Sequence, residues 1–74
     1  MKEIEIHTEE IALDQLLKYE GLAASGGEAK RMILEGDIWV NGESCQVIRK
    51  KLKPGDRVDI PDAGSFVIVK QNEN

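Results

Sequence analysis

The spacing of apolar residues changes twice along this chain, and each change restricts the folds that the chain can adopt. Residues 3–7 alternate between polar and apolar side chains, which predicts a strand with one buried face. The next apolar residues have helical spacing and predict a helix over roughly 11–20, ended by Gly21. Alternation returns over residues 38–70, so the chain should begin with a strand, continue as helix and end in strands.

A second helix is marked by its first turn. Ser25 and Glu28 fit the capping box, in which the two side chains reciprocally satisfy free backbone N–H groups. Ala29 and Ile33 then share an apolar face, and Gly36 should end the helix.

Turn residues divide the second half of the chain. Asn41-Gly42 is typical of a two-residue hairpin, because both positions need positive φ. Pro54 and Gly55 suit the central positions of a type II turn. The predicted strands of this half comprise residues 38–40, an irregular segment around 43–48, 58–60 and 65–70.

The length of 74 residues allows one domain, so residues 1–74 should fold as a unit. A domain this short buries only about 60% of the surface of its unfolded chain, so we expect no large cofactor cavity. Two adjacent helices on a small, mainly antiparallel sheet make an α+β fold. The last residues, 71–74, should fray.

Cysteine use and hydropathy favour a cytoplasmic protein. Cys45 is the only cysteine, whereas small secreted domains usually depend on disulfides. The start of the chain has no apolar stretch of signal-peptide length, and no run approaches the roughly 20 apolar residues of a membrane span. We therefore expect a soluble protein with no membrane partner, and we also expect a monomer.

Charge is unevenly distributed. The chain has a formal net charge of −4, yet residues 30–57 hold seven basic and four acidic groups, a net +3. The remaining residues hold three basic and ten acidic groups, a net −7. Because salt screens charges beyond about 10 Å, phosphates respond to a local basic patch, and the acidic balance predicts only that non-specific binding is weak.

Several short segments are weakly diagnostic alone but fairly specific in this order and spacing. They are Leu13-Asp14-Gln15-Leu16-Leu17-Lys18, Gly21-Leu22, Ser25, Glu28-Ala29-Lys30, Ile33, Gly36, Val40-Asn41-Gly42 and Leu52-Lys53-Pro54-Gly55-Asp56. The run from Leu13 to Ile60, about two-thirds of the chain, resembles the S-four RNA-binding domain of ribosomal small-subunit protein S-four. The leading strand, Ser25-Gly26-Gly27 and the short length look most like the stand-alone bacterial members of the YaaA or YbcJ type.

The resemblance implies a non-catalytic protein whose helix pair, the alpha-L motif, binds structured RNA, often ribosomal RNA or ribosomal particles. It implies no cofactor and no small-molecule substrate. The chain departs from the short members in one stretch. Val47-Ile48 stands where they tend to have paired arginines, and Arg49 stands where they have a glycine.

The start of the second helix also has a physical case for binding phosphate. A helix N-terminus presents free N–H groups and partial positive charge just after Ser25. Gly26 and Gly27 would let an RNA backbone approach closely. Lys30 and Arg31 follow within a turn and a half. The alternative is an ordinary capped helix with solvated charges.

The densest basic run is Arg49-Lys50-Lys51, followed by Lys53. It lies in the net-positive region, which favours phosphate contact over the alternative of a solvated loop. Lys18, near the end of the first helix, could face the same groove or simply favour the helix dipole.

These basic groups should share one face, with most of the N-terminal glutamates elsewhere. The two sets are Lys30, Arg31, Arg49, Lys50 and Lys51 against Glu3, Glu5, Glu9 and Glu10.

Three other residues are candidate site residues. Trp39 should point away from the core because its neighbours Ile38 and Val40 face inward, and it could stack on an unpaired base or pack on a helix or loop. One histidine, His7, and one cysteine, far apart in sequence, suggest neither a metal site nor a thiol–imidazole pair. We therefore expect no enzyme.

Two other functions stay open at this point. The chain could be a protein-interaction adaptor that kept the fold and lost strong RNA binding, which the acidic charge and Val47-Ile48 favour. It could also be an accessory fragment of an RNA-modifying enzyme, which would require assembly in trans.

Overall fold

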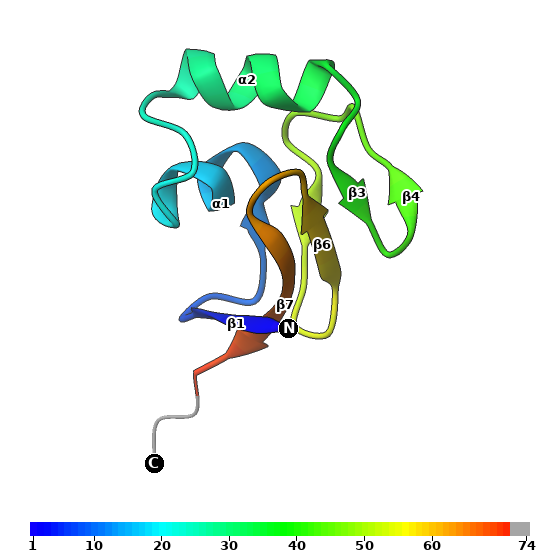
Figure 1. Ribbon diagram of the computed structural model, residues 1–74. Helices are drawn as coiled ribbons and strands as arrows, with labels where there is room; N and C mark the ends of the chain where they lie inside the picture. Colours follow the sequence, from blue (N-terminus) through cyan, green and yellow to red (C-terminus); the bar gives the residue numbers. More distant parts are fainter. Residues whose placement is uncertain (72–74) are drawn as a thin grey trace.

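The computed structural model in Figure 1 describes residues 1–71; the rest of the predicted frayed tail, residues 72–74, lies outside the described residues. Its elements, in chain order, are β1 (Lys2–Ile6), β2 (Ile11–Ala12), α1 (Leu13–Tyr19), α2 (Gly26–Leu34), β3 (Trp39–Val40), β4 (Glu43–Ser44), β5 (Lys51–Leu52), β6 (Arg57–Ile60) and β7 (Gly64–Lys70).

The larger sheet has the strand order β1-β7-β6-β3-β4. The first and last strands of the chain, β1 and β7, pair in parallel, and the other neighbours are antiparallel. The α+β class and the mainly antiparallel sheet are therefore confirmed.

Alternation along the strands places one face of the sheet against the helices. Ile4 and Ile6 of β1 are buried, as are Val58 and Ile60 of β6, while their neighbours in sequence are more exposed. The core that these strands share with the helices also includes Leu13, Leu16, Leu17, Ala29, Ile33, Phe66 and Ile68.

The first helix starts later than expected. It begins at Leu13 rather than residue 11, because Ile11–Ala12 forms β2 and pairs antiparallel with β5 in a separate two-stranded sheet. The Leu13 N–H then donates to the Lys50 carbonyl (2.8 Å), so the same segment that pairs with β2 also closes the helix start. The irregular strand expected over 43–48 ends at Ser44.

The predicted hairpin is confirmed and is tied to the turn before β6. Asn41 and Gly42 have φ of 52° and 85°. The Asn41 amide donates to an Asp56 carboxylate oxygen (3.1 Å), and its carbonyl oxygen accepts from the Arg57 N–H (2.9 Å). The Asp56 N–H donates to the Lys53 carbonyl (3.0 Å), which closes the predicted turn.

Replacing Asn41 by alanine should lower the free energy of unfolding by about 2 kcal/mol. The change removes two side-chain hydrogen bonds and puts a non-glycine residue without a local hydrogen bond in left-handed backbone. Urea denaturation measures this loss. Glu43→Ala, an exposed neighbour in β4, is the control and should change stability by less than about 0.5 kcal/mol. Equal effects of the two changes would contradict the role given to the Asn41 side chain.

Candidate nucleic-acid interface

The start of α2 is capped by one side chain. Ser25 has extended backbone, and its hydroxyl oxygen accepts from the Glu28 N–H (3.2 Å). The reciprocal bond of the capping box is absent among residues 1–71, because the Glu28 carboxylate does not accept from the Ser25 N–H. The N–H groups of Gly26 and Gly27 precede the first intrahelical bond, from Ala29 to Ser25, so the helix itself does not satisfy them.

Lys18 reaches this helix start from α1. Its Nζ atom lies 4.0 Å from the point where a Cβ on Gly26 would stand. An ammonium group and the positive end of a helix dipole therefore converge on the exposed start of α2. That combination suits an anion such as phosphate.

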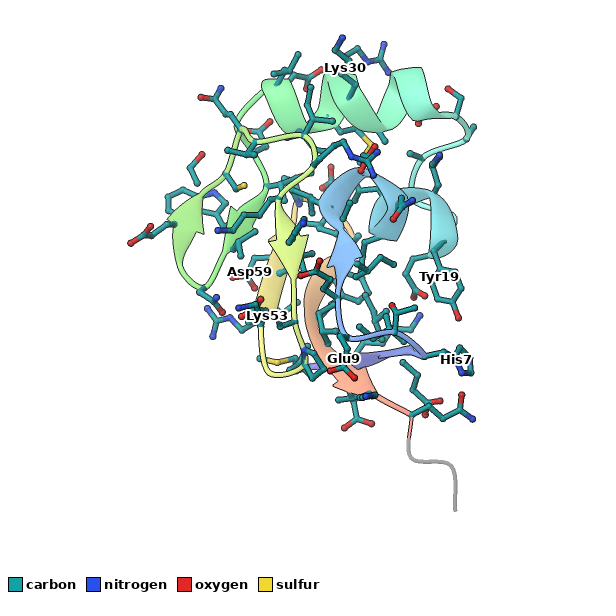
Figure 2. All side chains as sticks on the ribbon, turned by 180° about the vertical axis from the view of Figure 1, so that it is seen from behind. His7, Glu9, Tyr19, Lys30, Lys53 and Asp59 are labelled. Atoms are coloured by element: carbon teal, nitrogen blue, oxygen red, sulfur yellow. The ribbon has the colours of Figure 1, made fainter. Side chains whose placement is uncertain are left out.

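Lys30 and Arg31 occupy the outer side of α2. Both side chains are exposed, whereas Ala29 and Ile33 on the other side are fully buried. Figure 2 shows Lys30 pointing away from the domain. Arg31 has its Nε 3.9 Å from a carboxylate oxygen of Glu35, an exposed pair of the kind that contributes little to stability.

The basic loop packs against the start of α1. In addition to the bond from Leu13, the Asp14 N–H donates to the Ile48 carbonyl (3.1 Å), so loop carbonyls satisfy the first free donors of this helix. Arg49 has its Nη1 3.5 Å from Asp14 Oδ2, and Lys51 Nζ lies 3.4 Å from Glu10 Oε1.

Glu10 therefore lies beside the basic loop, whereas the prediction placed most of the N-terminal glutamates elsewhere. Acidic side chains are favourable near a helix N-terminus, and the loop that covers this one carries cations. Glu9 instead pairs with Lys70 of β7, and this lysine lowers the pKa of the Glu9 carboxyl.

One row of side chains on α1 connects the two basic regions. Asp14, which holds Arg49, and Lys18, which reaches Gly26, are one helical turn apart and share a face. Asp14 was not among the predicted site residues. Its other oxygen, Oδ1, is buried without a hydrogen-bond partner in the described part of the chain.

Lys53 lies apart from the second helix. Lys53 lies in the turn directly after β5. Figure 2 shows it well below Lys30 of α2. The candidate residues thus form two neighbouring regions and one distant cation, not a single cluster.

The Val47-Ile48 stretch has two separate roles. Val47 is 60% exposed and borders a hollow of about 360 Å³, which Lys50 and the β3–β4 hairpin also line. Ile48 packs against the core. Valine at the first position therefore leaves an exposed site without charge, while isoleucine at the second contributes to packing.

The other candidate residues belong to neither basic region. Trp39 is 46% exposed while Ile38 and Val40 are buried, which confirms its predicted direction. Cys45 is a buried free thiol. Within residues 1–71, no three His, Cys, Asp or Glu side chains could hold a metal ion together. Neither helix described has the length and apolar character needed to cross a membrane.

Comparison with known proteins gives one family and two relatives. The family described as "S4 domain" matches residues 4–69. The chain is 42% identical over 66 residues to "Probable ribosome maturation protein RlbA" of Bacillus subtilis (strain 168), a match that covers 89% of this chain and 93% of that protein. It is 41% identical over 49 residues to "Small ribosomal subunit protein uS4" of Natranaerobius thermophilus, a match that covers 66% of this chain and 23% of that protein.

The backbone does not require glycine at the start of α2, so Gly26→Ala and Gly27→Ala should each raise the free energy of unfolding by up to about 1 kcal/mol. Neither position has positive φ, and an added Cβ would meet its nearest neighbour at 3.9 Å or more. Gly42→Ala is the control, because its surroundings are open but its φ is 85°, and it should cost about 1–2 kcal/mol. Thermal or urea unfolding distinguishes the two directions, and a marked loss at position 26 or 27 would mean that the fold needs glycine there.

Proposed function

The chain belongs to the S4 domain family, and we propose that it is a non-catalytic, monomeric, cytoplasmic protein that binds structured RNA, namely ribosomal RNA or a ribosomal particle. The observation that carries this proposal is the convergence of Lys18 and the open start of α2. Both relatives are named for the ribosome, which supports a ribosomal partner.

Phosphate recognition would centre on the start of α2. The free N–H groups of Gly26 and Gly27 would donate to phosphate oxygens, and Lys18 and Lys30 would supply charge. Glycine has no Cβ, so the RNA backbone can come close to the helix. Contacts of this kind fix position and carry affinity, but they read little sequence, so we infer recognition by shape.

The loop beside α1 would extend this surface. Arg49 and Lys51 are paired with carboxylates, but their side chains remain 68% and 72% exposed. Exposed pairs contribute only about 0.2–1 kcal/mol, so phosphate can compete with the carboxylates for these cations. Lys50 is exposed beside them and adds a further positive charge.

The adaptor function is the second candidate. It is supported by the exposed apolar side chains of Val47 and Leu34, which are 60% and 49% exposed. Hydrogen-bond contact between the Gln46 amide and the Leu34 carbonyl (2.9 Å) brings the two segments together. This candidate predicts that basic residues do not determine binding, which the next experiment tests.

Replacing Lys30 and Arg31 together by alanine should weaken binding to ribosomal RNA fragments of unrelated sequence. Each side chain is exposed, so stability should change by less than about 0.5 kcal/mol per site. Each lost phosphate contact should also lower the slope of log affinity against log salt by about 0.7 to 0.9. Titrations at several salt concentrations, with duplex DNA as a second ligand, measure both effects.

The matched control is Lys2→Ala with Lys70→Ala, which removes the same charge at the far end of the domain from α2 (Figure 1). It should leave affinity and slope nearly unchanged. Loss of binding with an unchanged slope would mean that Lys30 and Arg31 act through structure. RNA binding could also withstand both the alanine changes at Lys30 and Arg31 and those at Arg49, Lys50, Lys51 and Lys53. In that case the adaptor function is the better candidate.

Gly27→Ala offers a test in which stability and binding change in opposite directions. The variant should be as stable as the parent or more so, yet bind the same RNA several-fold more weakly, because the new methyl group keeps the phosphate from the helix start. Unchanged affinity would show that the RNA backbone does not approach this position.

A further inference from the structure

The β6–β7 turn passes beneath α2 (Figure 1), and residues of this turn line a groove on the protein surface. It consists of two adjoining hollows of about 310 and 190 Å³, which share Asp37, Ile60 and Pro61. Trp39 lines the first hollow and Met32 lines the second. The groove therefore has apolar walls, and one of them is the half-exposed ring of the only tryptophan in the chain.

Its charged lining is entirely acidic. The carboxylates are Glu35, Asp37, Asp59 and Asp62, and no lysine or arginine lines either hollow. Glu35 and Asp59 are partly compensated, since Arg31 and Arg57 lie 3.9 and 3.2 Å from them.

Two of these carboxylates have no partner among the described residues. Within residues 1–71, the Asp37 and Asp62 side chains form no hydrogen bond or ion pair. The Ser65 hydroxyl donates to Asp59 and lowers the pKa of that carboxyl, which favours its charged form. The groove thus presents negative charge around an apolar surface.

We propose that this groove binds an extended basic segment of a partner protein, with an arginine side chain stacked on Trp39 and paired with Asp37. A guanidinium group is planar, stacks on tryptophan and forms paired hydrogen bonds with carboxylates, so it matches this lining better than the ammonium of lysine. The aliphatic stem of the arginine and a neighbouring apolar residue would cover Ile60 and Pro61.

The charge of the groove excludes RNA as its occupant, because carboxylates repel phosphates. In Figure 2, turned by 180° from Figure 1, α1 and β5 lie in front of β6 and β7, whose connecting turn borders the groove. A protein segment and RNA can therefore be bound at the same time. This inference does not depend on the proposed RNA binding.

The test uses the intact protein and a short synthetic peptide in which arginine and leucine alternate. Trp39 reports binding directly, since it is the only tryptophan. We expect a saturable change in its fluorescence that weakens as salt rises. The matched peptide with citrulline, the uncharged isostere, in place of arginine should bind at least about fivefold more weakly.

The double change Asp37→Asn and Asp62→Asn should lower the affinity for the arginine peptide by about fivefold and leave the affinity for RNA unchanged. Glu3→Gln with Glu5→Gln removes the same charge from β1 and should have no effect on the peptide. Equal binding of the citrulline peptide, or an unchanged affinity in the aspartate variant, would overturn the proposal. A change in Trp39 fluorescence on addition of RNA would also overturn the proposal. So would a change with protein concentration alone, because that result would indicate a second copy of the chain as the occupant.

Discussion

The contact between the 48–52 segment and the start of α1 is the interaction on which the rest of the structure depends. The N-cap residue of α1 is Ala12, whose methyl group cannot accept a hydrogen bond. The carbonyls of Ile48 and Lys50 accept from the first N–H groups of α1 instead. The β2–β5 pairing continues the same contact. It closes the second half of the chain onto the helix pair, and it sets the position of the basic loop relative to α1.

Local signals explain which parts of the fold could be predicted. The Ser25 cap, the Asn41-Gly42 turn and the alternation of Ile4 and Ile6 depend on neighbours in sequence, and the structure has all three. The two-residue β2–β5 ladder and the parallel β1–β7 pair depend on contacts between segments distant in sequence, and a stretch as short as Ile11–Ala12 carries no periodicity of its own.

The same distinction applies to the candidate site. The exposure of Lys30 and Arg31 follows from the helical spacing of Ala29 and Ile33, so it could be read from the sequence. The pairing of Lys51 with Glu10 could not, because it arises only when the loop covers the start of α1. Asp14 was missed for this reason, although an acidic residue in a first helical turn is a recognisable signal.

The arrangement of charge explains how an acidic protein can still be selective for RNA under the proposed function. Excess negative charge on the groove side repels polyanions from that side, so RNA is left to bind where the cations lie. The cations are divided between the start of α2 and the loop, with the Asp14–Lys18 face of α1 between them. A nucleic acid whose phosphates do not follow this spacing would contact only one of the two regions. A folded RNA whose phosphates span α1 would contact both. Because the attraction is short-ranged at physiological salt, this two-point spacing would select shape rather than sequence.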